Sequence, residues 1–417
     1  MNAPIERAEA NSLFLDSAAP SLDVPPQPSI RRLPLVPIGG WRWAWKARRT
    51  ESGKARDESA PSLNRLRSRR MKRCGRAALM WVLLWYGISL IVPGLLKDRW
   101  LRIGPANEAR KWPALRHLVS QEPDRSLLLM LGSSRACWAF RAGCLEGMPD
   151  SDGKPLHVYN FGIPATGPIS ECFYLRDMLA KGIRPRFALI EFLPPLMNES
   201  QRGSLTEEGM TGFESIDAHR FRQWYPYLNR PGKRGRLWLE ARIAPWYTFR
   251  RQIQLETKCL VERVPFPTYQ PLDDWGWTIL APMPFPESAR QERLATAHSG
   301  YSPGLGNFRL GKKPTQALRQ TLDLCRKERI PAALVVMPES SAFRSWYSDE
   351  GKAAVRALLD ELRATYGVEV IDAERWLADD DFEDGHHTLF HGAEVFTQRL
   401  RAELPRLLSQ SKPPKSD

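Results

Sequence analysis

The chain has 417 residues, of which 42% are hydrophobic and 26% charged, a balance that excludes a protein disordered throughout. Six scattered Cys without any C-x-x-C pair exclude both a disulfide-built scaffold and a structural zinc ribbon. The formal net charge is +14, but residues 1–76 hold 16 Lys and Arg against 7 Asp and Glu. Most of the positive charge therefore belongs to this first segment, and the rest of the chain does not favour nucleic-acid binding.

Residues 1–75 are predicted to form a disordered, basic and Pro-rich cytoplasmic tail. They contain eight prolines and no sustained apolar period. Such a segment buries too little surface to offset the entropy lost on ordering.

Residues 77–96, AALMWVLLWYGISLIVPGLL, contain no charged residue. A helix of this length rises ~30 Å, the thickness of the hydrocarbon core of a bilayer, so we predict a single-pass transmembrane signal anchor. A buried helix of a soluble domain is the alternative. The basic residues that precede the run are Arg65, Arg67, Arg69, Arg70, Lys72, Arg73 and Arg76. Positive flanks stay cytoplasmic, which predicts contact with anionic lipid headgroups and an extracytoplasmic body that meets no nucleic acid.

The body, residues 107–417, alternates short apolar runs with helical patterns. The predicted strands are 126–131, 156–160, 186–192, 332–337 and 368–371, and the predicted helices are about 168–182, 313–328, 349–366 and 392–408. Strands separated by helices predict an α/β fold with a doubly wound parallel sheet. Active sites of such sheets form at the carboxyl ends of the strands.

Residues 200–310 interrupt this alternation and are predicted to be an insertion between the third and fourth strands. The segment is rich in Pro and carries Trp224, Trp238, Trp246, Trp275 and Trp277. Long insertions on a rigid scaffold often carry function, which favours a lid or a sugar-stacking surface. An aromatic-rich packing subdomain is the alternative.

Two of the predicted strands end in small residues that suit a catalytic site. The first ends in Gly132-Ser133-Ser134-Arg135, a turn that exposes a hydroxyl beside the N–H groups of the next helix. The second ends in Asn160-Phe161-Gly162, where a glycine permits close approach of a ligand to the backbone. Either turn alone is also compatible with a purely structural role.

The C-terminal segment Asp384-Gly385-His386-His387 places an Asp and a His three residues apart before an amphipathic helix. A contact from the Asp carboxylate to Nδ1 fixes the tautomer of the His, and Nε2 is then able to accept the proton of a hydroxyl. A Ser elsewhere becomes a nucleophile in the chain order Ser, Asp, His.

Together these segments resemble the SGNH (GDSL-type) hydrolase superfamily over residues of about 120–200 and 313–408. The resemblance implies a flavodoxin-like sheet and a membrane-anchored extracytoplasmic branch, which reads Gly-Ser-Ser-Arg in the first block. It implies Ser134 as the nucleophile, with Asp384 and His387 as its partners. It also implies that the backbone N–H groups of Ser134 and Gly162 form the oxyanion hole.

The third block of the family, Gly-x-Asn, has no counterpart at the end of the third strand. Asn198, after a Pro-Pro turn, is the candidate for the missing oxyanion donor, and Asn160 is its rival. After the fourth strand, Glu339 and Arg344 are predicted substrate contacts because polar residues at a strand's carboxyl end line the same cleft. A solvated loop is the alternative there.

Two further patterns leave alternatives open. The first is a zinc site, whose candidate ligands are Asp381, Asp384, His386, His387 and His391. A zinc site would leave the Ser134 turn unexplained, so no metal and no cofactor is predicted. Cys137 and Cys144 lie seven residues apart and would be able to pair in an exported domain.

The sequence therefore predicts a membrane-anchored, extracytoplasmic serine esterase or O-acyltransferase. The resemblance implies acyl esters of envelope or exported polysaccharide as the substrate. Hydrolysis and transfer differ only in whether water or a sugar hydroxyl intercepts the acyl-enzyme, and the sequence does not separate them. The alternative is an inactive envelope module whose aromatic insertion binds a glycan or a partner protein. The missing Gly-x-Asn block favours the module, and the intact Asp-x-x-His pattern favours the enzyme.

Overall fold

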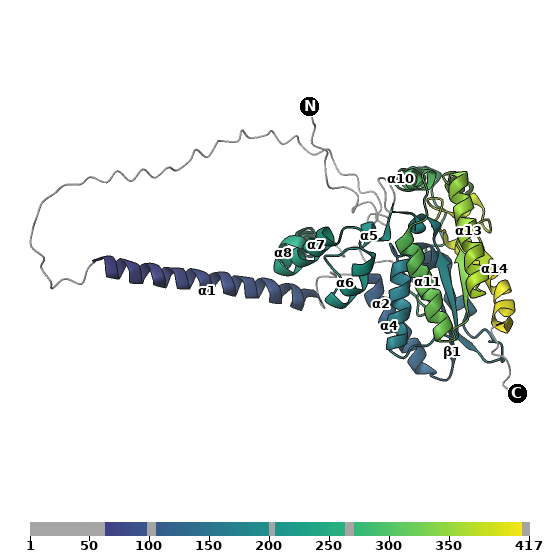
Figure 1. Ribbon diagram of the computed structural model, residues 1–417, viewed down its shortest axis with the longest axis horizontal. Coiled ribbons are helices and arrows are strands. Elements are labelled where there is room, and N and C mark those ends of the chain that lie inside the picture. Colours follow the sequence, from purple (N-terminus) through teal and green to yellow (C-terminus); the bar gives the residue numbers. More distant parts are fainter. Residues whose placement is uncertain (1–62, 98–105, 200–204, 263–270, 411–417) are drawn as a thin grey trace, which may run out of the picture. The chain divides into compact units, whose positions relative to one another are not determined.

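The computed structural model of the chain describes residues 63–97, 106–199, 205–262 and 271–410. It divides into two compact units between residues 89 and 90, and each unit is described by itself. Figure 1 shows the long helix of the first unit and the layered body that makes up the second.

Helix α1, Leu63–Lys97, contains all the described residues of the first unit. Residues 63–75 of the predicted tail are therefore helical, and residues 1–62 lie outside the described residues. From Leu79 to Ile88 the large apolar side chains of α1 are exposed. Among the described helices, none is long and apolar enough to cross a membrane, so the predicted transmembrane helix at 77–96 is not supported.

The body is built on a sheet of five parallel strands in the order β2-β1-β3-β4-β5. The strands are β1 Ser126–Gly132, β2 Leu156–Gly162, β3 Phe187–Phe192, β4 Ala332–Val336 and β5 Glu369–Asp372. The register pairs Gly132 with Gly162, so the ends of β1 and β2 lie side by side. The doubly wound α/β fold predicted from the alternation of strands and helices is confirmed.

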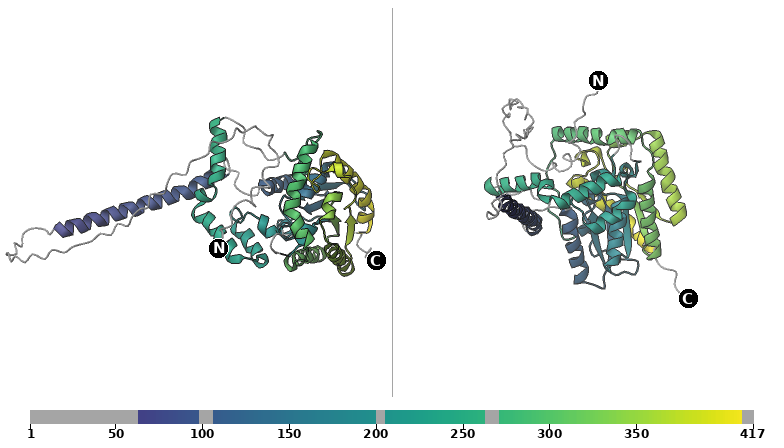
Figure 2. Two further views of the ribbon diagram at one scale, coloured as in Figure 1. Left: turned by 90° about the horizontal axis from the view of Figure 1, so that it is seen from above. Right: turned by 60° about the vertical axis from the view of Figure 1, so that its left-hand side comes forward.

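Helices cover both faces of the sheet because alternate residues of each buried strand point to opposite sides (Figures 1 and 2). Leu129 and Leu131 of β1 belong to one core, and Leu128 and Met130 to the other. The first core contains residues of α2 Ala106–Gln121, α4 Pro168–Ala180, α11 Lys312–Lys327 and α13 Asp349–Tyr366. The second contains residues of α3 Ser134–Ala139 and α14 Phe390–Gln410.

The predicted insertion at 200–310 contains several helices, and its described residues 271–286 are non-helical. Its α-helices are α5 Glu207–Met210, α6 Ala218–Trp224, α7 Pro231–Ile243, α8 Pro245–Thr248, α9 Arg250–Glu262 and α10 Glu287–Gly306, and α11 follows before β4. Phe213, Trp224 and Tyr227 pack with Phe173 of α4 in a third, smaller core. Much of the aromatic content of the predicted insertion is thus used for packing.

The remaining elements are short and lie in connections. They are α12 Ser341–Ser345 and the 3-10 helices η1 Ala142–Leu145, η2 Pro194–Met197, η3 Tyr225–Tyr227 and η4 Asp379–Asp381. Cys137 and Cys144, whose pairing the sequence left open, are both free thiols, the first buried and the second exposed.

Candidate active site

The turn after β1 places Ser134 as the first residue of helix α3. Ser133 is the N-cap residue, and its hydroxyl accepts a hydrogen bond from the N–H of Arg135 at 3.1 Å. A cap of this kind fixes where the helix begins. Ser134 therefore lies at the carboxyl edge of the sheet and at the amino end of a helix.

Ser134, His387 and Asp384 form a continuous hydrogen-bonded chain. The Oγ of Ser134 lies 2.7 Å from Nε2 of His387, and Nδ1 of His387 lies 2.6 Å from Oδ2 of Asp384. Ser134 and His387 are 253 positions apart along the chain. The fold thus brings the three predicted triad residues together with the order of contacts that a serine nucleophile requires.

The Asp384 carboxylate is held by its own loop as well as by His387. Its Oδ1 accepts hydrogen bonds from the N–H groups of His386 at 3.1 Å and His387 at 2.8 Å. Burial acts to raise the pKa of Asp384, but the two His side chains and these hydrogen bonds outweigh it and hold the pKa well below its usual range. The carboxylate is therefore ionised and oriented across ordinary working pH values.

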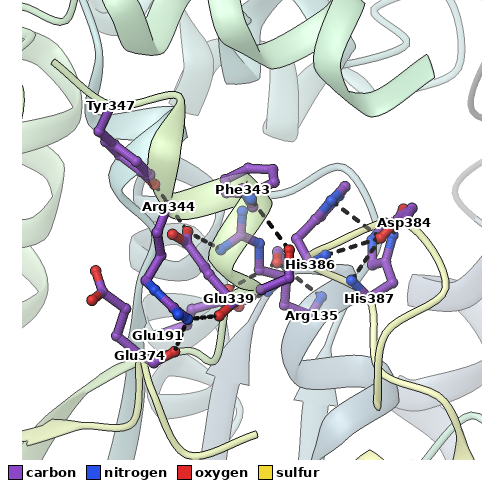
Figure 3. Close-up of polar contacts among 12 residues, drawn as sticks. Arg135, Glu191, Glu339, Phe343, Arg344, Tyr347, Glu374, Asp384, His386 and His387 are labelled. Atoms are coloured by element: carbon purple, nitrogen blue, oxygen red, sulfur yellow. Dashed lines mark hydrogen bonds and ion pairs between the residues drawn. The ribbon is translucent and has the colours of Figure 1, made fainter. Parts of the chain in front are cut away.

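Aromatic side chains hold the His387 ring in place on two sides. The ring centroid of Trp138, on α3, lies 4.3 Å from that of His387, and the His386 centroid lies 4.0 Å away. His386 is itself packed against Tyr301 and Phe343. Burial lowers the pKa of His386 well below its usual range, so this ring is neutral. Figure 3 shows both His side chains beside Asp384.

Glu191, at the end of β3, supports the turn that carries the nucleophile, a role that the sequence analysis missed. Its Oε2 accepts from the N–H of Ser133 at 2.5 Å and its Oε1 from the Ser133 hydroxyl at 3.0 Å. The N–H of Ala136 also contributes a hydrogen bond. A Cβ at Gly132 would lie 2.5 Å from Oε2 of Glu191, so the glycine leaves space for this carboxylate.

Arg135 and Glu339 form a buried ion pair beside the triad. Nη1 of Arg135 lies 2.6 Å from Oε1 of Glu339, which also accepts from the Tyr347 hydroxyl at 2.9 Å. The guanidinium lies over the ring of Phe343, 4.8 Å from its centroid. Figure 3 shows this group of residues next to His386.

Glu339 and Arg344, the predicted substrate contacts, are used inside the protein. Glu339 is 3% exposed and its carboxylate is paired with Arg135. Nη1 of Arg344 donates to the backbone carbonyls of Glu339 and Glu374. The structure thus assigns both side chains to the support of the loop after β4 rather than to an open cleft.

The predicted oxyanion donors are largely committed to other hydrogen bonds. The N–H of Gly162 donates to Oδ1 of Asn160 at 2.8 Å, and the Asn160 amide donates to the carbonyls of Ala136 and Phe140. A Cβ at Gly162 would lie 2.5 Å from the backbone nitrogen of Cys137, so this glycine serves helix packing.

Asn198 is equally committed, because its amide donates to the Gly304 carbonyl at 2.7 Å and accepts from the N–H of Arg309 at 3.0 Å. The N–H of Ser134 differs from these groups. It belongs to the first turn of α3, where N–H groups have no partner within the helix, and no hydrogen bond ties it within the described residues. Of the predicted donors, the Ser134 N–H is the one that has no hydrogen-bond partner among the described residues.

The loop after β2 contains a backbone conformation that non-glycine residues rarely adopt. Ala165 has a φ of 62°, and the next residue, Thr166, donates its hydroxyl to the Gly132 carbonyl at 3.2 Å. This hydrogen bond ties the loop to the turn that precedes Ser134. Strained backbone of this kind tends to gather at functional sites.

Part of the candidate zinc set comes together. One ligand atom from each of Asp384, His386 and His387 lies within 4.8 Å of the others. His391 is exposed and its Nε2 lies 4.0 Å from Oδ1 of Asp381, outside this group. Two of the three clustered residues belong to the hydrogen-bonded triad, so a metal ion bound there would compete with it.

The chain is similar to two family models and to a solved structure. A family model described as a protein of unknown function (DUF1574) matches residues 108–221, and a second model without a description matches residues 312–409. No curated protein matches the chain. The crystal structure of a "putative acylhydrolase" from Bacteroides fragilis has 11% sequence identity and a TM-score of 0.31. The match covers 71% of this chain and 98% of that one.

Proposed function

We propose that the protein is a serine esterase or O-acyltransferase. The observation that carries this proposal is the continuous contact from Ser134 Oγ to His387 Nε2, at 2.7 Å, and from His387 Nδ1 to Asp384 Oδ2, at 2.6 Å. A nucleophile, a general base and an orienting carboxylate in this order activate a hydroxyl for attack on an acyl carbon.

In the proposed reaction, Ser134 Oγ attacks the carbonyl carbon of an ester while its proton passes to Nε2 of His387. Asp384 keeps the proton on Nδ1 and stabilises the imidazolium that forms. The Ser134 N–H, at the positive end of α3, donates to the oxyanion. His387 then returns its proton to the departing alcohol, which leaves an acyl-enzyme on Ser134.

The second half of the reaction releases the acyl group. His387 removes a proton from water or from an acceptor hydroxyl, whose oxygen attacks the acyl carbon and restores Ser134. With water the product is a carboxylic acid, and with a sugar hydroxyl it is a new ester. The proposal therefore covers hydrolysis and transfer with the same residues.

We further propose an extracytoplasmic site tethered to a membrane by residues 77–96, with acyl esters of envelope or exported polysaccharide as substrate. The exposed apolar side chains of α1 and the basic residues before them support the tether. The resemblance to exported SGNH proteins supports the substrate class.

The proposal is tested by labelling the body, residues 98–417, with a fluorophosphonate probe. The wild-type body is expected to be labelled, because the probe reacts with activated serines, and the Ser134→Ala variant is expected to lose all labelling. Ser345→Ala is the matched control, because it removes an exposed hydroxyl that contacts no triad residue. Folded wild-type protein that takes no label would contradict the proposal.

A non-catalytic envelope module is the second candidate. The observation that favours it is the commitment of Gly162 and Asn198 to structural hydrogen bonds, which leaves the Ser134 N–H alone among the predicted oxyanion donors. The same labelling experiment decides between the two, since an inactive module has no activated serine.

A further inference from the structure

Helices α7 and α8 expose a group of large apolar side chains on one surface of the body. Leu239 is 50% exposed, Ile243 51%, Trp246 41% and Tyr247 55%. Leu239 and Ile243 are four residues apart and share one face of α7. Trp246 and Tyr247 follow on α8, with ring centroids 5.8 Å apart.

The opposite face of α7 packs against other residues of the insertion. This packing determines that the face with Leu239 and Ile243 is the exposed one. Trp238 lies 5.0 Å from Phe221 between ring centroids, Ala241 is buried, and Arg242 donates to the Ile216 carbonyl. Arg234 forms an ion pair with Glu208 at 3.2 Å. The helix is therefore anchored to the body, and its exposed side chains do not turn inward.

The segment that carries the exposed apolar side chains is rich in cations. Residues 230–262 contain 8 Lys and Arg against 3 Asp and Glu. Lys233, Arg236, Arg250 and Arg251 are exposed. The Arg250 guanidinium lies 4.2 Å from the ring centroid of Tyr247, and Arg236 forms an exposed ion pair with Glu240 at 2.6 Å, which a lipid phosphate would compete with. We name these four cations with Leu239, Ile243, Trp246 and Tyr247 the α7–α8 surface.

We propose that the α7–α8 surface binds the headgroup region of an anionic lipid bilayer. Aliphatic and aromatic side chains together with Lys and Arg on one short helical surface are the composition of interfacial helices. The apolar chains enter the headgroup boundary, and the cations pair with lipid phosphates. The excess of positive over negative side chains in residues 230–262 complements the charge of anionic lipid. This proposal does not depend on the chemistry of Ser134.

Flotation with lipid vesicles tests the proposal on the body, residues 98–417. The body is a suitable protein because every residue of its three cores lies between Leu115 and Leu408. It is expected to float with vesicles of phosphatidylcholine and phosphatidylglycerol, and far less with phosphatidylcholine alone. Added salt is expected to weaken the binding.

Two sets of substitutions separate the apolar and charged contributions. Leu239→Ser with Ile243→Ser and Trp246→Ser is expected to reduce the partition coefficient by about tenfold or more. Arg236→Gln with Arg250→Gln and Arg251→Gln leaves the apolar chains in place and is expected to abolish the preference for anionic vesicles. Ile279→Ser with Met283→Ser removes other exposed apolar chains and is the matched control, expected to bind as wild type.

Three results would overturn the proposal. They are no flotation of the wild-type body with anionic vesicles at low salt, unchanged flotation of both sets of variants, and a dimer in light scattering that the same substitutions dissociate without any vesicle binding. The Ser134→Ala body is expected to float as wild type. Lipid binding by the α7–α8 surface is therefore tested independently of the labelling of Ser134.

Discussion

At the scale of single residues, the candidate site is a layered arrangement around one hydroxyl. Asp384 orients His387, and Glu191 holds the turn of Ser133 from the opposite side. Burial raises the pKa of Glu191, while the hydrogen bonds from Ser133 lower it. These bonds go to Ser133, the residue before the nucleophile. The Glu191 carboxylate therefore influences Ser134 only by fixing where Ser134 lies.

Glu191→Gln is expected to slow fluorophosphonate labelling between about tenfold and a hundredfold, because a small displacement of a nucleophile costs that much. The amide replaces one of the two acceptor oxygens that hold Ser133. The second-order labelling rate, corrected for the folded fraction, measures this effect.

Glu207→Gln is the matched control for that variant. Glu207 is also a buried carboxylate at a helix amino end, where it accepts from the N–H groups of Ile169 at 3.0 Å and Ser170 at 2.8 Å. Both substitutions are expected to lower thermal stability, but only the change at Glu191 should alter the labelling rate. Equal labelling rates in the two variants would exclude a positioning role.

Part of the site was predictable from the sequence and part was not. Asp384 and His387 are close in sequence, and Ser134 ends an apolar run, so local patterns identify all three. Glu191 lies 58 residues from Ser133, and its carboxylate is not distinguished by any local pattern. The commitments of Gly162 and Asn198 were equally hidden, because a hydrogen-bond partner is known only once the chain has folded.

At the scale of elements, the five strands were predictable because fully buried parallel strands are short, continuous apolar runs. Helix α4 contains a feature that periodicity does not reveal, the buried Glu171 in its first turn. Both of its carboxylate oxygens lack a hydrogen-bond partner among the described residues. Burial, together with the nearby Glu191 and Glu207, raises the pKa of Glu171 well above its usual range.

Glu171→Gln is expected to stabilise the body, and more so as the pH rises. A carboxyl whose pKa is raised in the folded state contributes its full stability below its unfolded pKa of about 4.3. That stability is lost as the pH rises toward the folded-state pKa. Glutamine resembles the protonated form and does not titrate. The expected gain in unfolding free energy is small near pH 4 and at least about 1 kcal/mol near pH 8.

Urea unfolding of the two proteins across this pH range measures the difference. Glu292→Gln is the matched control, because it makes the same substitution at an exposed carboxyl of α10. A Glu171→Gln gain that is independent of pH would show that the carboxyl does not change its protonation on folding.

At the scale of the whole molecule, the chain joins a long helix to an α/β body. The exposed apolar side chains of α1 form the largest such group among the residues whose exposure is described. Exposed apolar surface on this scale marks contact with a membrane or with another protein. The proposed membrane tether is therefore open to a direct test.

The full chain is expected to stay with membranes after alkaline extraction, and a chain that lacks residues 1–97 is expected to be released. Leu83→Arg with Leu84→Arg should also release it, since a charge near the bilayer centre costs roughly 2.5 to 3.5 kcal/mol. Leu63→Arg with Leu66→Arg, outside the apolar run, is the matched control and should remain bound. Release of the unmodified full chain would exclude a tether.

The Ser134–His387 contact joins residues 253 positions apart, and the Arg135–Glu339 ion pair joins residues 204 apart. During synthesis the serine leaves the ribosome long before its base does. Under the proposed function, a nascent chain that ends before His387 therefore contains an unactivated Ser134, and esterase chemistry begins only once the loop of Asp384 and His387 has folded beside it. Activation would thus be coupled to the synthesis of the segment that carries Asp384 and His387.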